Sequence, residues 1–235
     1  MKAEDRIIVA LDTPSSEVAL EQVSVLVPQV SRFKVGLELF CAAGPAVIEQ
    51  IAGLGGRVFL DLKLHDIPNT VAGAARVLRR AGVWMTNVHA AGGPQMMAAA
   101  REAFPDAVLL AVTVLTSLDQ HILTEYLGIP MRVEEVVGRW ALRAQEEGLD
   151  GVVCSPREIG AVRSAAGDQF LVVTPGIRPT WSETGDQRRV SSPGEALRRG
   201  ADYLVIGRPI TGAADPRAAV RRLVGEMRGE VSIDE

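Results

Sequence analysis

Acidic and basic side chains gather in one short segment of the chain, residues 58–66. Residues 58–64 have the composition of a β-strand, in which alternate side chains face opposite sides. The even positions are all apolar, so the odd positions place Asp61 and Lys63 together on the other side, and Asp66 follows in a loop. An unpaired buried charge is unfavourable, so these groups must pair with each other or with a charged ligand. Such an acid and ammonium pair is suited to binding a charged substrate and to proton transfer. A purely structural ion pair is the alternative.

Two other strand-like runs carry matching charges. Asp12 directly follows the first run of the chain, and Lys34 lies in the middle of the second. An aspartate at a strand end is often only the cap of the next helix. A lysine within an apolar strand, however, needs an anionic partner. Together with Asp61 and Lys63, these two residues can form one array of alternating charge at adjacent strand ends.

Glycine and arginine follow two later runs. Arg178 comes two residues after Gly176, and Gly207 directly precedes Arg208. Glycine lets backbone N–H groups approach an anion, and arginine adds charged donors. We therefore predict a phosphate site here, with solvated arginines as the alternative. The polar segment 179–189 predicts a lid that closes over a ligand, or else a plain surface loop.

These residues lie at the ends of regularly spaced β-branched runs. Strands are predicted over Arg6–Leu11, Arg32–Gly36, Arg57–Leu62, Met85–His89, Val108–Thr113, Gly151–Cys154, Phe170–Val173 and Asp202–Ile206. Helices are predicted between most of them, among others over Ser16–Val27, Pro68–Ala81, Val133–Glu147 and Asp215–Met227.

Eight strands that alternate with helical segments favour an α/β fold, a (β/α)8 TIM barrel, over an open sheet. No G-x-G-x-x-G motif follows the first strand, where a dinucleotide-binding sheet would carry it. We expect a single domain over residues 1–235, with a frayed tail at 228–235. In such barrels the carboxyl ends of the strands hold the active site, and the loops after strands seven and eight bind phosphate.

Composition excludes several classes of protein. The chain has 235 residues, of which 47% are hydrophobic and 23% charged, so it is not disordered. Its net charge of −4 provides no basic field for a nucleic acid. The longest apolar stretch, Ala107–Leu115, is too short to cross a membrane, and no secretory signal is evident. Cys41 and Cys154 lack disulfide or zinc spacing. We therefore expect a cytoplasmic protein with no membrane or nucleic-acid partner.

The ordered set of motifs resembles the orotidine 5′-phosphate decarboxylases, in their shorter bacterial form. The resemblance runs from Ile7 to about Pro216, and Asp61–Thr70 is its most specific segment. The other matching segments are Val9–Asp12, Phe33–Gly36, Thr113–Ser117, Thr174–Pro179, Gly185–Arg189 and Val205–Pro209. The resemblance implies decarboxylation of orotidine 5′-phosphate to uridine 5′-phosphate, the last step of de novo pyrimidine synthesis. It also implies a homodimer with shared active sites and no metal or organic cofactor.

The resemblance further implies a role for each matching residue. The catalytic array corresponds to Lys34, Asp61, Lys63 and Asp66, in which Lys63 donates the proton to C6 and Asp66 comes from the second subunit. The contacts with substrate correspond to Asp12, Lys34 and Thr70 at the ribose hydroxyls, Thr116 at the base, and Arg178, Gln187, Gly207 and Arg208 around the phosphate, and Asp61 is also among the substrate-binding residues. Thr70, like Asp66, would serve the site of the partner subunit.

Two other functions remain open at this point. A metal-dependent phosphosugar enzyme on the same barrel, of the hexulose-phosphate synthase or epimerase type, would need a divalent ion. The three histidines lack metal-ligand spacing, so no metal site is predicted. A catalytically silent nucleotide-binding barrel is the second alternative, and the complete charged array argues against it. His89 faces the same end of the barrel, and we interpret it as a structural or interface hydrogen-bonding group.

Overall fold

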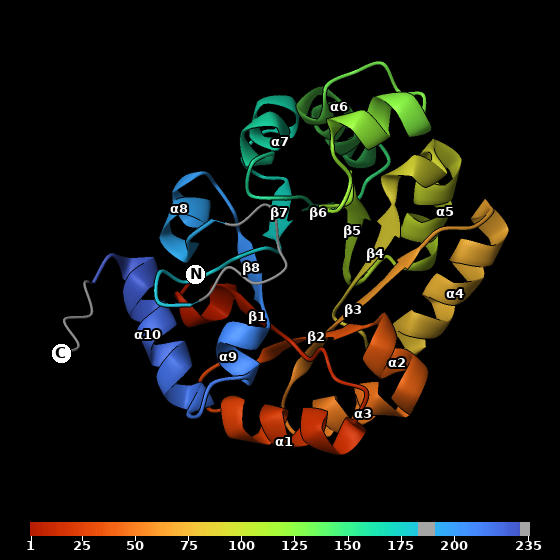
Figure 1. Ribbon diagram of the computed structural model, residues 1–235. Helices are drawn as coiled ribbons and strands as arrows, with labels where there is room; N and C mark the ends of the chain where they lie inside the picture. The colour runs from red at the N-terminus through yellow and green to blue at the C-terminus, as the bar shows by residue number, and fades with distance from the viewer. Residues whose placement is uncertain (183–190, 231–235) are drawn as a thin grey trace.

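Eight parallel strands form the centre of the molecule. The computed structural model describes residues 1–182 and 191–230. Within these ranges the strands close into a barrel in chain order, each paired with the next and β8 with β1 (Figure 1). The strands are β1 (Ile7–Ala10), β2 (Arg32–Gly36), β3 (Arg57–Leu64), β4 (Met85–His89), β5 (Val108–Val112), β6 (Gly151–Val153), β7 (Leu171–Thr174) and β8 (Tyr203–Ile206). The predicted (β/α)8 barrel is therefore confirmed, and the predicted strand ends lie within two residues of the observed ones.

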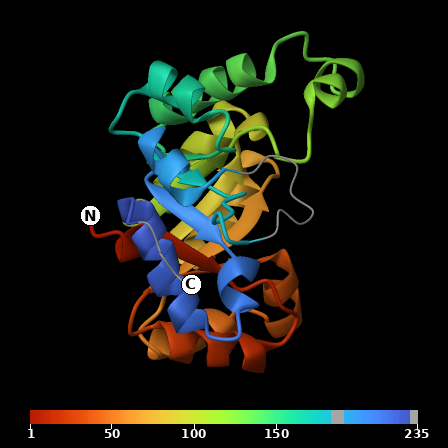
Figure 2. The same cartoon turned by 60° about the vertical axis from the view of Figure 1, so that its left-hand side comes forward.

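Helices surround the strands on the outside (Figure 1). They are α1 (Ser16–Leu26), α2 (Leu37–Ala43), α3 (Ala46–Gly53), α4 (Pro68–Arg80), α5 (Pro94–Ala103), α6 (Val133–Glu146), α7 (Ile159–Ala166), α8 (Pro193–Arg198), α9 (Arg208–Thr211) and α10 (Pro216–Arg228). The connection between β5 and α6 contains a π-helical turn, η3 (Ile122–Tyr126), and projects beyond the ring of helices (Figure 2).

The starts of several helices follow from side-chain caps. The Ser15 hydroxyl accepts the Val18 N–H at the start of α1, and the Asp215 carboxylate accepts the Ala218 N–H at the start of α10. These caps satisfy N–H groups that have no partner within the helix. Arg228, where a polar tail is predicted, is the last residue of α10, and residues 231–235 of that tail lie outside the described ranges.

Alternation along the strands separates two apolar clusters. The larger cluster lies between strands and helices and includes Val58 and Leu60 of β3. The smaller one fills the barrel and consists of Ile8, Ala10, Phe59, Met85, Leu110, Val173, Tyr203 and Val205. The predicted sides of β3 are therefore correct, because Phe59 faces inward while its neighbours face the helices.

Aromatic rings cover the barrel interior at its amino-terminal end. Trp84, just before β4, meets Tyr203, the first residue of β8, edge to face with ring centroids 5.7 Å apart. The Arg32 guanidinium lies over both rings, 5.3 Å from the first centroid and 5.7 Å from the second. Cation–π contacts of this kind favour a fixed arrangement. Ligands of such barrels bind at the other end, at the carboxyl ends of the strands.

Candidate active site

An ion pair marks the carboxyl end of β3. The Lys63 ammonium donates a hydrogen bond to Asp61 Oδ1 over 2.7 Å. The pairing of β3 with β4 is irregular at this point, since Leu60 lies opposite Thr86 while Leu64 lies opposite Val88. This bulge turns the chain, and Lys63 adopts a left-handed backbone conformation with φ of 54°. Such a conformation is unfavourable for a bulky residue and is typical of functional sites.

Asp61 lies at the centre of the charged array. Its second carboxylate oxygen is 3.7 Å from the Lys34 ammonium, which in turn donates to Asp12 Oδ1 over 2.9 Å. The side chains of Asp61 and Lys34 are only 13% and 12% exposed, whereas that of Asp12 is 61% exposed. The structure therefore brings Asp12, Lys34, Asp61 and Lys63 together at the ends of β1, β2 and β3, as the strand pattern predicts.

The electrostatics of this array keep the central carboxylate ionised. Burial raises the pKa of Asp61, but the Lys34 and Lys63 ammonium groups and the hydrogen bonds from Lys63 and Asn87 outweigh it. The net result is a pKa for Asp61 below its ordinary value. Two ammonium groups thus flank one fixed negative charge, and they are available to a second anion at the open end of the barrel.

Two glycines keep the space around the array open. A Cβ atom at Gly36 would lie 2.9 Å from the Lys34 ammonium. A Cβ atom at Gly207, after β8, would lie 3.4 Å from Ala10 Cβ and 3.5 Å from an Asp12 carboxylate oxygen. Any larger residue at Gly36 would displace the lysine. The contact at Gly207 also shows that the end of β8 meets the end of β1, so the predicted phosphate loop adjoins the charged array.

Asn87 belongs to this site, although it is not among the residues predicted from the sequence. It lies in β4 and is fully buried. Its Oδ1 accepts the backbone N–H of Lys63 over 2.8 Å, and its Nδ2 donates to Asp61 Oδ1 over 2.7 Å. The one signal in the sequence is an amide at an inward position of β4, two residues after the inward-facing Met85.

Asp66 and Thr70 do not join the array within their own chain. Both side chains are exposed, and the Asp66 carboxylate accepts the N–H of the next residue, Ile67, over 2.6 Å. In the described part of the chain, Asp66 has no ion pair with Lys63. Thr70 lies in the first turn of α4, where it faces solvent.

The other predicted substrate contacts lie at the same end of the barrel. Thr116 is exposed in the connection after β5, and Arg208 is exposed at the start of α9. Arg178 follows β7, is half-buried, and donates to the carbonyl of Ile177 over 3.0 Å. Gln187 and most of the predicted lid lie outside the described residues.

Two histidines lie next to the array. The rings of His65 and His89 have centroids 5.2 Å apart. Burial, together with the nearby charges of His65 and Lys63, lowers the pKa of His89. His89 is therefore neutral at neutral pH, which suits a hydrogen-bonding role better than a charged one.

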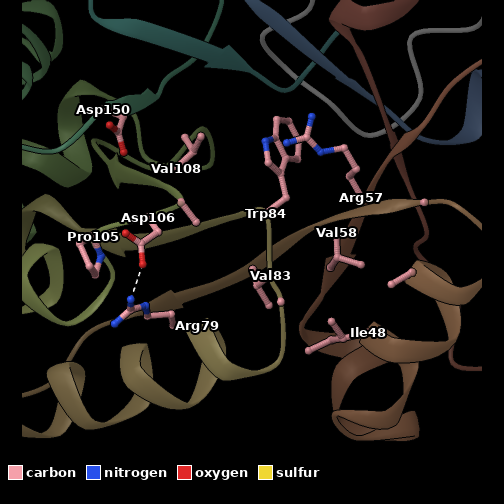
Figure 3. A pocket seen from close by; sticks show the side chains of 14 residues that line it. Ile48, Arg57, Val58, Arg79, Val83, Trp84, Pro105, Asp106, Val108 and Asp150 are labelled. Carbon is pink, nitrogen blue, oxygen red and sulfur yellow. Dashed lines mark hydrogen bonds and ion pairs between the residues drawn. The ribbon is translucent and has the colours of Figure 1, made fainter.

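A separate cavity of about 720 Å³ opens at the opposite end of the barrel, near the starts of β3, β4 and β5 (Figure 3). The Arg57 guanidinium stacks 4.8 Å above the Trp84 ring there, and Arg79 pairs with Asp106. None of the members of the charged array lines this cavity. The volume of a cavity alone therefore does not identify the active site. The charged array and the carboxyl ends of the strands identify it.

Among the described residues, no three His, Cys, Asp or Glu side chains are grouped so that they could hold a metal ion. Among the same residues, no helix is both long and apolar enough to cross a membrane.

Comparisons with known proteins identify the family of the chain. The family model described as "Orotidine 5'-phosphate decarboxylase / HUMPS family" matches residues 5–223. An orotidine 5′-phosphate decarboxylase from Moorella thermoacetica is 58% identical, covering 97% of this chain and 94% of its own. One from Syntrophomonas wolfei is 53% identical over 97% of this chain and 99% of its own. The crystal structure of orotidine 5′-phosphate decarboxylase from Lactobacillus acidophilus superimposes with a TM-score of 0.84 at 39% identity, covering 95% of this chain and 99% of that one.

Proposed function

The chain belongs to the orotidine 5′-phosphate decarboxylase / HUMPS family, and we propose that the charged array at the ends of β1, β2 and β3 carries out its reaction. The enzyme decarboxylates orotidine 5′-phosphate to uridine 5′-phosphate in pyrimidine biosynthesis. Three relatives that are 53% to 58% identical, each covering more than nine-tenths of both chains, are orotidine 5′-phosphate decarboxylases, which favours this reaction over that of a phosphosugar enzyme. The observation that carries the proposal is the alternating array of Asp12, Lys34, Asp61 and Lys63.

The difficulty of the reaction explains the need for such an array. When the bond between C6 and the carboxylate breaks, carbon dioxide leaves and the electron pair stays on C6. This pair lies in the plane of the ring and cannot delocalise into the ring carbonyls. A fixed positive charge beside C6 stabilises the developing carbanion. Lys63 provides this charge and then transfers a proton from its ammonium to C6.

The carboxylates hold Lys63 ready for this step. Asp61 is 2.7 Å from the Lys63 ammonium, and its negative charge keeps that ammonium protonated and oriented. Lys34 lies on the other side of Asp61 and holds it in place. After the transfer, Lys63 is neutral and regains its proton from solvent before the next turnover.

The remaining predicted residues bind the rest of the substrate. Asp12 and Lys34 contact the ribose hydroxyls, since the exposed Asp12 carboxylate and the Lys34 ammonium bonded to it form the end of the array away from Lys63. Thr116 contacts the base. The phosphate lies between the loops after β7 and β8, bound by Arg178, Gln187, Gly207 and Arg208. The closeness of Gly207 to Asp12 supports this assignment, because it allows one ligand to reach both regions.

The enzyme acts as a homodimer with shared active sites. Asp66 and Thr70 are exposed in their own chain and so can reach the site of a neighbour. Two large apolar side chains of the same segment are exposed, Ile67 at 67% and Val77 at 59%. In α4, Thr70 and Val77 are seven residues apart and hence on one side of the helix. Exposed apolar residues beside a functional loop support an interface with a second copy.

The cell compartment is proposed on the chemistry of the cysteines. Cys41 is an exposed free thiol and Cys154 a buried one. Free thiols are typical of a reducing compartment, so we place the enzyme in the cytoplasm, where nucleotide precursors are made.

An ultraviolet assay tests the reaction directly. Loss of the carboxylate changes the absorbance of the pyrimidine ring, so turnover of orotidine 5′-phosphate can be followed continuously, with excess EDTA present throughout. We expect full activity in EDTA and one carbon dioxide released per uridine 5′-phosphate formed. Absence of turnover, or activity that a divalent ion restores after chelation, would contradict the proposed function and favour a metal-dependent phosphosugar enzyme.

A further inference from the structure

The bulge in β3 leaves backbone and side-chain groups that must be satisfied from outside the strand. Between Leu60 and Leu64, three residues of β3 face only Asn87 of β4, because Leu60 pairs with Thr86 and Leu64 with Val88. A bulge interrupts the regular ladder, so the Lys63 N–H loses its ordinary carbonyl partner. A buried N–H without a partner is strongly unfavourable. The Asn87 side chain fills this gap by accepting that N–H over 2.8 Å.

The same amide also contacts the carboxylate at the centre of the array. Asn87 Nδ2 donates to Asp61 Oδ1 over 2.7 Å, and this oxygen also accepts the Lys63 ammonium. A carboxylate only accepts and a backbone N–H only donates, so the amide satisfies both in just one orientation. No other small side chain has a donor and an acceptor on opposite branches at this spacing. The residue type is therefore dictated by its two partners.

We propose that Asn87 is a positioning residue of this enzyme, whose single amide holds the Lys63 backbone in its left-handed conformation and fixes the Asp61 carboxylate against the Lys63 ammonium. Lys63 and Asp61 are adjacent to the reacting carbon only if the proposed function is correct, so the kinetic part of this inference rests on it. Asn87 itself is fully buried beneath these residues. It acts through them and does not touch the substrate.

A neighbouring residue offers a matched control. Thr86 precedes Asn87 in β4, is equally buried, and donates its hydroxyl to the carbonyl of Leu60 in β3 over 2.9 Å. It thus makes a buried bond between the same two strands, but on the side that faces the helices. Thr86→Val removes this bond without touching the array. It reports the effect of weaker packing between β3 and β4 alone.

The kinetic test compares Asn87→Ala with Thr86→Val. For Asn87→Ala we expect kcat to fall roughly 10- to 100-fold, because Lys63 and Asp61 lose their fixed positions. The dissociation constant for uridine 5′-phosphate should change less than about threefold, since the contacts with the nucleotide remain. Thr86→Val should lower the melting temperature but leave kcat within about threefold of wild type. Equal losses of kcat in both variants would show that Asn87 has only a structural role and would overturn the inference.

The isosteric variant Asn87→Asp should show a characteristic dependence of kcat on pH. The introduced carboxylate can still accept the Lys63 N–H, but it repels Asp61 instead of donating to it. Once protonated, it can donate again. The charged groups around it are Asp61, Lys63 and Lys34, and the neighbouring titratable group is His89. We expect the ratio of variant to wild-type kcat to rise as the pH falls. A ratio that does not change with pH would contradict the bridging role, and this variant decides the question if Asn87→Ala does not fold.

A readout without turnover separates this inference from the proposed function. Titration of the Asp61 carboxyl carbon by ¹³C NMR reports its pKa directly. Loss of the Asn87 donor should raise that pKa in Asn87→Ala and leave it unchanged in Thr86→Val. If wild type did not decarboxylate orotidine 5′-phosphate, the proposed function would fail while this titration would still test the bridge. An unchanged titration in Asn87→Ala would overturn the bridge itself.

Discussion

Lys63 and Asp61 are two residues apart in one strand, where their charged atoms meet at 2.7 Å and the Lys63 backbone is left-handed. In a regular strand, side chains two residues apart project in parallel and their Cα atoms lie about 6.6 Å apart, twice the rise per residue. The pairing of β3 with β4 is irregular between Leu60 and Leu64, the stretch that contains both residues. Lys63 thus combines an unfavourable backbone conformation with the ammonium group on which the proposed proton transfer depends.

Removal of the Lys63 amine should abolish the reaction. For Lys63→Ala we expect kcat to fall by at least about 1,000-fold, since both the electrostatic stabilisation of the carbanion and the proton donor are lost. The variant should remain folded and bind uridine 5′-phosphate, as measured by calorimetry. A kcat within about tenfold of wild type would show that Lys63 is not the proton donor.

The left-handed backbone at Lys63 predicts an unusual effect of glycine. Lys63→Gly should be more stable than Lys63→Ala by about 1 kcal/mol, because glycine adopts φ of 54° without steric conflict. Urea unfolding measures the difference. Lys34 provides the control, since its φ is not in this region and glycine should there be less stable than alanine. If glycine were less stable than alanine at both positions, the backbone at Lys63 would not be strained.

Loss of Arg208 should weaken binding of the phosphate. For Arg208→Ala we expect kcat/KM to fall by an amount equivalent to roughly 2–5 kcal/mol, as for loss of a charged hydrogen bond. The loss should shrink for orotidine, which lacks the phosphate. Arg143→Ala removes an exposed arginine paired with Glu146 on α6 and should have no effect. Equal losses on both substrates would place Arg208 outside the phosphate site.

Shared active sites predict that two inactive variants restore each other. Lys63→Ala and Asp66→Asn homodimers each carry one defect in every site. If Asp66 serves its neighbour, a mixed dimer combines both defects in one site and leaves the other intact. Activity should therefore rise from near zero as subunits exchange, and mass spectrometry can count the mixed dimers. Demonstrated exchange without any recovery would show that Asp66 serves its own barrel.

The lowered pKa of His89 predicts a dependence of stability on pH. His89 is held neutral in the folded protein, whereas in the unfolded chain it gains a proton near its ordinary value of 6.5. The unfolded state then binds more protons, so stability falls as the pH decreases from 6.5 through the lower pKa of the folded state. The free energy of unfolding, measured with urea at several pH values in this range, should depend less steeply on pH in His89→Gln than in wild type. His121→Gln, at an exposed histidine, should keep the wild-type slope, and an unchanged slope in His89→Gln would refute the assignment.

Local pattern was sufficient to predict most of the fold. Apolar runs predicted each strand within two residues, and alternation correctly directed Phe59 inward and Leu60 outward. The same alternation predicted that Asp12, Lys34, Asp61 and Lys63 come together. These inferences hold because they depend on the period of a strand and on the order of neighbouring strands, both of which are visible in the sequence.

The bulge in β3 could not be predicted in the same way. The predicted end of β3, Leu62, is two residues short of the observed end, because the strand continues to Leu64 through an irregular pairing with β4. Register between strands depends on contacts across the barrel, which spacing along one strand does not contain. For the same reason Asn87, whose partners lie in another strand, is absent from the predicted site.

The stack of Trp84, Tyr203 and Arg32 has a consequence for inhibition by the product. These groups fill the barrel at its amino-terminal end, so the charged array is reached from the carboxyl ends of the strands. Orotidine 5′-phosphate and uridine 5′-phosphate share that opening and the same proposed contacts. Bound uridine 5′-phosphate therefore prevents the next substrate molecule from binding. Inhibition by this product should be strictly competitive with orotidine 5′-phosphate.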